Sequence, residues 1–230
     1  MSSSKNDQAL NDPNPDLGRV RAEIDKLDQT ILQAIEDRAA LAAQVSQAKS
    51  GRHTFRPGRE ADLIRNLVQH ANLPSKLIEQ IWRNIIAHNL TSQAGLKIAL
   101  QDDHATMAAG TFRFGTNYET IVSASADDVI TAVASGQADL GILPDWQADQ
   151  SWLDVLHQHR QAGAGVYISA YTHMLADHGL QQSVVLSSIL PDPSSNDTTL
   201  VMAENQLSEI QGHHPEQPGI LGIIQNCDIS

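Results

Sequence analysis

Apolar residues recur every three or four positions through residues 17–49, which is the pattern of one long amphipathic helix. These positions share one helical face and are Leu17, Val20, Ile24, Leu27, Ile31, Ala34, Leu41, Val45 and Ala48. The step between Ala34 and Leu41 falls on Arg38, and Lys49 follows three turns later, close to the same face. Burying an unpaired cation is costly, so we expect an anionic ligand between Arg38 and Lys49.

A third cation, Arg21, lies beside the same face. It is 17 residues from Arg38, which places the two Cα atoms about 25 Å apart on a straight helix. One small ligand cannot contact both residues of the same helix. A second copy of the helix, running antiparallel, would bring its own Arg21 to the site. The alternative is that Arg21 is a solvated residue on the flank of the helix.

Two shorter helices are predicted after the long one, the first beginning near Arg59 and the second spanning residues 75–94. Residues 1–15 are polar and are expected to form a disordered tail. Each short helix carries polar residues where its apolar face continues, and these are Glu60, Asn89 and Gln93. The two short helices cannot cover a helix about 50 Å long. We therefore expect the long helix to pair with a second copy of the chain.

A different pattern begins after Gly95. Short apolar or β-branched runs predict strands at 96–100, 120–125, 138–143, 165–170, 183–190, 198–203 and 220–224. Amphipathic stretches at 127–135 and 152–160 predict helices between some of them. The expected fold class is α + α/β: a three-helix domain over 16–95, forming an intertwined dimer, and a small α/β domain over 96–230 with an open, partly parallel sheet.

The charge of the chain is divided unevenly between these parts. The net charge is −12, but residues 1–95 carry 12 Lys and Arg against 11 Asp and Glu, whereas residues 96–230 carry 3 against 16. An anionic ligand is therefore expected in the first part, and nucleic acid is excluded as a partner of the second. His157, His159 and the pair His213-His214 are interpreted as surface residues, so no metal site is predicted.

The sequence also indicates the compartment in which the protein acts. The first residues lack the apolar segment of a signal peptide, and no apolar run is long enough to span a membrane. The single cysteine, Cys227, excludes an internal disulfide. We expect a cytoplasmic protein.

Several motifs follow one another in order across the three predicted helices. They are VRAEID from Val20, EDRAALAAQV from Glu36, then Lys49, RPGRE from Arg56 and IIAHNLTSQ from Ile85. In this order they resemble the all-helical chorismate mutases over about residues 17–94. The resemblance implies a homodimer with shared active sites that rearranges chorismate to prephenate in aromatic amino-acid biosynthesis. It also implies that the reaction needs no cofactor.

The resemblance implies a role for each polar residue of the helices. Arg38 would hold one carboxylate of chorismate, and Arg21 of the partner chain would hold the other. Lys49 and Gln93 would donate hydrogen bonds to the ether oxygen of the breaking bond. Glu60 would accept a hydrogen bond from the ring hydroxyl, and Arg59 would support that corner of the site. Asn89 lies where some members of the family have a serine. Arg56 departs from the pattern, because relatives often have an aspartate there.

Residues 96–230 faintly resemble the prephenate dehydratase domain that follows a mutase domain in bifunctional enzymes. DDVITAVASGQADLGILPD, starting at Asp127, carries this resemblance. Gln101-Asp102 replaces an expected Gly-Pro, and Thr198-Thr199-Leu200 replaces a catalytic Thr-Arg-Phe. We therefore interpret this half as a degenerate, non-catalytic domain that is open to a regulatory ligand or a pathway-enzyme partner. Two alternatives stay open for the whole chain: an isochorismate–pyruvate lyase on the same scaffold, and an inactive regulatory or interaction module.

Overall fold

A computed structural model describes residues 15–48, 55–175, 179–204 and 206–226 of the chain. It divides into two compact units, of which the first ends at Ala48 and the second covers the rest. The helices are α1 (Pro15–Ala48), α2 (Pro57–His70), α3 (Ser75–Ala94), α4 (His104–Phe114), α5 (Ala126–Ala134) and α6 (Ser151–Gln161). The strands are β1 (Lys97–Gln101), β2 (Glu119–Ser123), β3 (Leu140–Pro144), β4 (Tyr167–Tyr171), β5 (Ser183–Ser187), β6 (Asp197–Ala203), β7 (Gln206–Gln211) and β8 (Ile220–Gln225).

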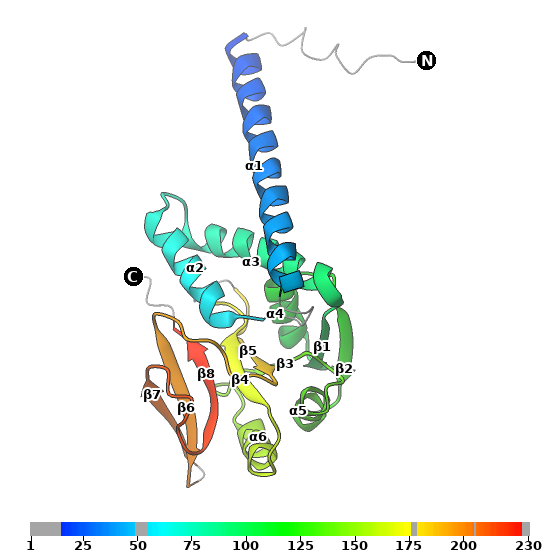
Figure 1. Cartoon of the computed structure of the whole chain (residues 1–230), viewed down its shortest axis with the longest axis vertical. Coiled ribbons are helices and arrows are strands. Elements are labelled where there is room, and N and C mark those ends of the chain that lie inside the picture. The colour runs from blue at the N-terminus through cyan, green and yellow to red at the C-terminus, as the bar shows by residue number, and fades with distance from the viewer. Residues whose placement is uncertain (1–14, 49–54, 176–178, 205, 227–230) are drawn as a thin grey trace. The chain divides into compact units, whose positions relative to one another are not determined.

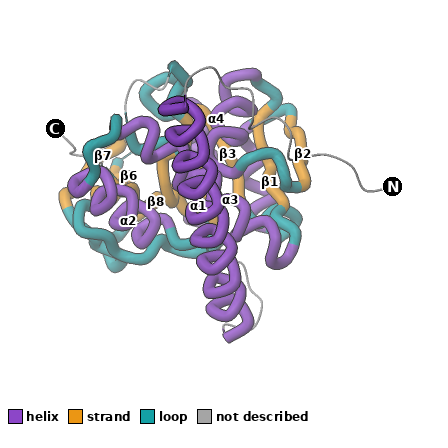
Figure 2. The backbone as a smooth tube through the Cα atoms, turned by 90° about the horizontal axis from the view of Figure 1, so that it is seen from above, coloured by secondary structure: helices purple, strands orange, loops and turns teal. Residues whose placement is uncertain are grey.

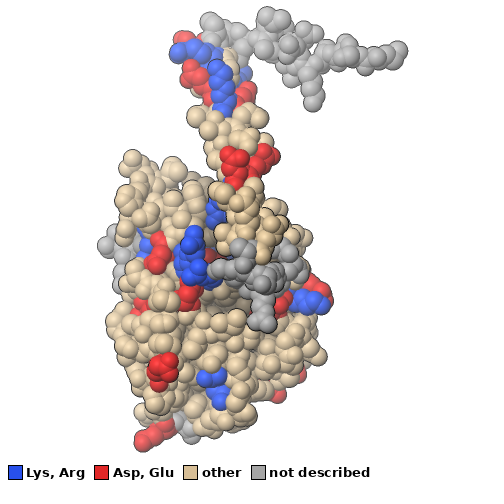
Figure 3. Space-filling model, in the orientation of Figure 1, with Lys and Arg blue, Asp and Glu red and all other residues tan. Residues whose placement is uncertain are grey.

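The first unit consists of the 34-residue helix α1. The apolar face predicted for this helix, here called the apolar seam, is exposed in the single chain. Ile24 is 50% exposed, Leu27 62% and Leu41 61%. Charged side chains of both signs lie near the N-terminal end of the helix and are followed by a stretch of uncharged surface (Figure 3). A long helix whose apolar face is open to water gains little from its own contacts, since most helical stability comes from packing such a face.

The second unit is built on one eight-stranded sheet with the strand order β2-β1-β3-β5-β4-β8-β6-β7 (Figure 1). Strand β1 runs parallel to both β2 and β3, and β4 runs parallel to β8. The other pairings are antiparallel. The sheet is therefore mixed, which confirms the open, partly parallel sheet expected from the sequence.

Both faces of the central strands are buried, because alternate residues enter different cores. Ile98 and Leu100 of β1 enter a core that also contains Phe114 of α4. Ala99, between them, faces the opposite core with Val129 of α5. Helices on both faces explain why these strands read as continuous apolar runs rather than as alternating ones.

Helices α2 and α3 belong to the same unit as the sheet. α2 contacts β8, and α3 packs along α4 (Figures 1 and 2). The sequence pattern predicts that α3 buries the face with Ile78 and Ile81. Ile78 is buried, at 2% exposed, but Ile81 is 39% exposed. The buried side also carries Glu79 and Arg83, because buried ion pairs allow charged residues to face the packed side.

The fold class predicted from the sequence, helices followed by an α/β part, is confirmed. The predicted strand runs correspond to β1–β6 and β8, and the two predicted helices correspond to α5 and α6. The sequence pattern missed α4 and β7. None of the helices in the described residues combines the length and the apolar character that crossing a membrane requires.

Candidate active site

Two of the predicted site residues lie in the first unit, on α1. Arg38 is partly buried and Arg21 is exposed. Because Arg21 and Arg38 are 17 positions apart and the rise is about 1.5 Å per residue, they lie far apart along the helix. Lys49 lies outside the described residues.

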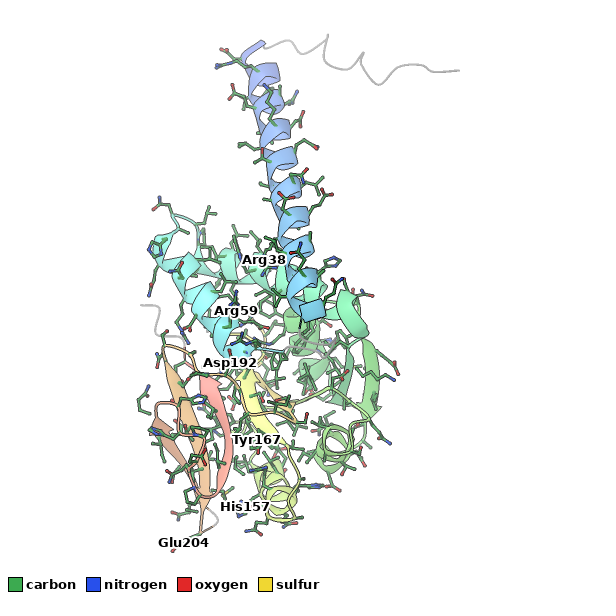
Figure 4. The ribbon with its side chains drawn as sticks, viewed as in Figure 1. Arg38, Arg59, His157, Tyr167, Asp192 and Glu204 are labelled. Carbon is green, nitrogen blue, oxygen red and sulfur yellow. The ribbon has the colours of Figure 1, made fainter. Side chains whose placement is uncertain are left out.

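The start of α2 positions the next two residues. Pro57 occupies the first turn of the helix, where a missing backbone N–H is harmless. Arg59 is exposed, and Figure 4 shows it on α2. Glu60 points inward, and its side chain is only 13% exposed. A carboxylate buried to this extent needs cationic or hydrogen-bonding partners.

Two arginines meet the Glu60 carboxylate at the same oxygen. The Arg83 Nη1 donates to Glu60 Oε2 at 3.1 Å, and the Arg113 Nη2 donates to it at 2.9 Å. Arg83 comes from α3, and Arg113 comes from α4 of the α/β part. Glu60, assigned from the sequence to the ring hydroxyl of chorismate, thus receives charge-assisted hydrogen bonds from two other helices.

A second carboxylate completes this cluster. Glu79 Oε1 accepts from the Arg83 Nε at 3.4 Å, and the Glu79 carboxylate also accepts from the backbone N–H groups of Met174 and Leu175 at 2.7 and 3.1 Å. Arg83 is therefore shared between two carboxylates. The cluster contains two cations and two anions, so the buried charges balance.

Arg113 is buried, as Arg83 is, and it also lies against two aromatic rings. Its guanidinium carbon lies 5.3 Å from the ring centre of Phe55 and 5.7 Å from that of Phe114. Burial lowers the pKa of Arg113 to about 9, and the charge of Arg83 acts in the same direction, while Glu60 and Glu79 oppose the shift. Arg113 therefore keeps its proton at neutral pH.

Sequence reasoning did not find Arg83, Glu79 or Arg113 as partners of Glu60. Glu79 and Arg83 are four residues apart, a spacing that allows a helical ion pair and was a usable signal. The sequence pointed to Arg113 only weakly, because it is one of just three Lys and Arg residues in residues 96–230. Its pairing with a residue 53 positions earlier depends on how the helices pack, which the sequence alone does not reveal.

The C-terminal half of α3 carries the last two predicted residues, one turn apart. Asn89 is partly buried, and its Nδ2 has no hydrogen-bond partner among the described residues. The side chain of Gln93 lies outside the described part of the chain. A cavity of about 280 Å³ lies nearby, between α3 and the end of α4, and is lined by residues that include His88, Thr91 and Asn117. Of the predicted site residues whose side chains the structure describes, none lines this cavity.

In the second unit, the structure places some of these residues close together along a helix. Arg59 and Glu60 share the first turn of α2, and Asn89 and Gln93 share one stretch of α3. All four belong to the second unit, whereas Arg21 and Arg38 belong to the first. The four residues of the second unit combine a cation with amide and carboxylate side chains, which suits the binding of a ligand that carries both an anionic group and a hydroxyl.

Residues 20–94 match the family model of chorismate mutase type II. The resemblance of this helical segment to the chorismate mutases is therefore confirmed. A "Bifunctional chorismate mutase/prephenate dehydratase" of Pseudomonas aeruginosa is 28% identical over 139 residues, which is 56% of this chain and 38% of that protein. The protein of the same name from Aquifex aeolicus is 27% identical over 139 residues, with the same shares.

The chain therefore spans about two fifths of the length of the curated relatives it matches. An alignment over 56% of the chain is longer than the whole stretch up to residue 94, so it extends into the α/β part. The relatives' names state both activities, in agreement with the fusion inferred from the sequence. One solved structure, titled "GqqA- a novel type of quorum quenching acylases", is 20% identical, with a TM-score of 0.38 over 57% of this chain and 95% of that chain.

Proposed function

We propose that the protein is a chorismate mutase that converts chorismate to prephenate. The observation that carries this proposal is the family match over residues 20–94, the segment that contains Arg21, Arg38, Arg59 and Glu60. Chorismate carries two carboxylates, and arginine is the side chain best suited to hold a carboxylate through paired hydrogen bonds. Arg38 holds one carboxylate in this proposal, and Arg21 of a second copy holds the other.

The proposed reaction is an intramolecular pericyclic rearrangement, so it needs no general base or nucleophile. The protein accelerates it by holding the folded conformer of the substrate and by aiming hydrogen-bond donors at the ether oxygen, where negative charge develops. Lys49 and Gln93 are the proposed donors. Glu60 accepts from the ring hydroxyl, with Arg59 and Asn89 beside it.

The proposed active form is a homodimer whose sites are shared between two copies. The exposed apolar seam of α1 supports this, since Leu17, Val20, Ile24, Leu27 and Ile31 are each at least 41% exposed in the single chain. Leu77 and Ile81 on α3 are exposed as well, at 42% and 39%. A second copy would cover these side chains and would bring its Arg21 to the site.

The α/β half is proposed to be non-catalytic. Thr198 and Thr199 stand where the dehydratase resemblance expects Thr-Arg, so the arginine is missing. The Thr198 hydroxyl accepts from the Asn226 side chain at 2.7 Å. The Thr199 hydroxyl donates to the Gly212 carbonyl at 2.7 Å and accepts from the backbone N–H of His214 at 3.0 Å. Both hydroxyls are thus used inside the fold.

The test is to incubate the purified full-length chain with chorismate and to follow the loss of chorismate absorbance. We expect prephenate as the product, and we expect added prephenate to persist. A parallel incubation with isochorismate, assayed for salicylate and pyruvate, separates the mutase from a lyase on the same scaffold. Failure to consume chorismate would contradict the proposal, and turnover of isochorismate alone would favour the lyase.

A further inference from the structure

We propose that the α/β half of the chain is the scaffold that holds Glu60 in place for the mutase reaction, with Arg113 as its positioning residue. This inference rests on the proposed function, since it assigns Glu60 to the substrate's ring hydroxyl. It goes further by giving the α/β half a task in the helical active site. Arg113 does not contact the substrate in this proposal; it acts through Glu60.

The first support is the direct contact between Arg113 and Glu60. The 2.9 Å bond from the Arg113 Nη2 and the 3.1 Å bond from the Arg83 Nη1 both end on Glu60 Oε2. Two cations at one oxygen hold Oε2 in place, and Oε1 is then the oxygen that the proposal assigns to the ligand. Holding a functional group through a second residue in this way is what gives a site its geometry.

The second support is that Arg113 is itself held firmly. It is only 3% exposed, and its guanidinium lies against the rings of Phe55 and Phe114. Its helix α4 has a well-defined start, because the Asp103 side chain accepts from the backbone N–H groups of Ala105 and Thr106. Because Arg113 has so little freedom, it holds the Glu60 carboxylate at a fixed position relative to the α/β core.

The third support is that α2 is anchored to the α/β half on both sides of Glu60. On the N-terminal side, the Arg56 Nη2 lies 2.9 Å from the Asp192 carboxylate. A Cβ atom on Gly58 would overlap the backbone carbonyl oxygens of Asp192 and Pro193, so the first turn of α2 lies directly on this loop. Glycine is required at a contact this close.

On the C-terminal side of Glu60, the buried Arg65 fastens α2 to the next part of the same loop. Its Nη1 donates to the Ser195 hydroxyl at 2.6 Å, and its Nη2 donates to the Ser194 hydroxyl at 3.0 Å. Its Nε donates to the Asn226 carbonyl at 3.1 Å. Glu60 therefore lies between two anchors, both supplied by residues of the α/β half.

The experiment measures kcat and KM for chorismate with the full-length chain and three single variants. Arg113→Met removes the charge and keeps most of the side-chain volume, whereas Arg113→Lys keeps the charge. Arg160→Met is the matched control, because Arg160 also comes from the α/β half and also lies over an aromatic ring, that of Tyr167 at 3.9 Å. Its Nη1 donates to the Ala164 carbonyl at 2.8 Å. Circular dichroism and thermal unfolding report the folded fraction of each variant.

We expect Arg113→Met to raise KM and to lower kcat/KM by about ten- to a hundredfold, the usual effect of losing a hydrogen bond to a charged group. Arg113→Lys should recover most of this loss, and Arg160→Met should leave KM unchanged. Combining Arg113→Met with Glu60→Gln should cost little more than Glu60→Gln alone, because both changes act on the same group. A purely structural role would reduce the active fraction, and with it kcat, without changing KM.

Each remaining outcome contradicts one of the two proposals. If the wild-type chain turns over chorismate and a folded Arg113→Met variant keeps the wild-type KM, the positioning role is wrong while the mutase function stands. A lower KM in that variant would show that Arg113 withholds Glu60 from the substrate, which also overturns the inference. If the wild-type chain does not consume chorismate, the proposed function fails, and this inference fails with it.

Discussion

The two arginines on α1 and the glutamate on α2 were assigned to one site from the sequence, yet their surroundings differ. Arg38 lies on the apolar face of α1 and Arg21 lies beside it, and the apolar side chains of this face are open to water in the single chain. Glu60 on α2 is largely enclosed and is bonded to arginines of two other helices. The apolar face of α1 is exposed in the single chain, whereas Glu60 on α2 is held by contacts within the chain.

This difference indicates where each part of the site obtains its geometry. A buried charge cluster with balanced ion pairs is rigid, because moving one member leaves the others unpaired and desolvated. An exposed apolar seam gains order only when another surface covers it. We therefore expect that changes on α2 act within one chain, whereas changes on α1 act across the proposed dimer.

The largest effect is expected from Arg38→Ala. If the Arg38 guanidinium serves the ligand, its loss should remove about 3–5 kcal/mol of transition-state stabilisation, which is roughly two to four powers of ten in kcat/KM. Steady-state turnover of chorismate measures this directly. Arg19→Ala on the same helix is the control, because Arg19 forms an exposed 4.0 Å pair with Glu23. Turnover near the wild-type rate in Arg38→Ala would contradict the site assignment.

A large effect on stability is expected from Arg65→Ala in the second unit. The change leaves Asp62, the hydroxyls of residues 194–195 and the Asn226 carbonyl without their guanidinium partner. Breaking such a buried network costs about 2–4 kcal/mol in the free energy of unfolding. Urea unfolding checks this value. A loss below about 0.5 kcal/mol, as expected for an exposed pair, would show that the loop does not anchor α2.

A smaller, pH-dependent effect is expected from Asp62→Asn. Burial raises the pKa of Asp62, but hydrogen bonds from Ser195 and the charge of Arg65 outweigh it and leave this pKa below the usual 3.8. The unfolded chain thus takes up the proton at a higher pH than the folded chain. The stabilisation is complete above pH 3.8 and is lost as the pH falls through the folded pKa.

The advantage of the wild type over Asp62→Asn should therefore shrink as the pH is lowered from about 5 to about 3. The Asp62 side chain is 43% exposed, so the effect should stay below about 1 kcal/mol. Unfolding curves at several pH values measure it. A difference between the two proteins that is constant over this range would contradict the assignment of Asp62.

The smallest effect is expected for the pH dependence of the rate around neutrality. A neutral amide at Gln93 donates its hydrogen bond at every pH, unlike a carboxyl group that must be protonated. Turnover at saturating chorismate should therefore change little between about pH 6 and about pH 8. A steep fall over this range would indicate a titrating group at the ether oxygen in place of Gln93.

Local patterns predicted much of the fold. The apolar runs of β1–β6 and β8 are visible in the sequence because both faces of the central strands are buried. β7 is an edge strand with mostly exposed side chains, so it has no such run. α4 was missed because HATMAAGTFRF contains many small residues and few large ones, which gives a weak helical period.

The contacts of the predicted site residues were harder to predict than the fold. Arg38 and Glu60 stand out because a charge interrupts an apolar face, which is a local signal. Their surroundings depend on packing between distant segments, as in the contact between Glu60 and Arg113. The buried face of α3 shows the same limit, since Glu79 and Arg83 are stable there only because partners arrive from α2 and from the loop after β4.

The shared site is tested most directly by mixing two inactive variants, Arg21→Ala and Arg38→Ala. Each should be nearly inactive alone, because every site lacks one arginine. In a mixed dimer, one site combines the Arg38 of the first chain with the Arg21 of the second, and the other site has neither. After subunit exchange between equal amounts, random pairing predicts roughly a quarter of the wild-type activity. No recovery, although mass spectrometry shows mixed dimers, would contradict the shared site.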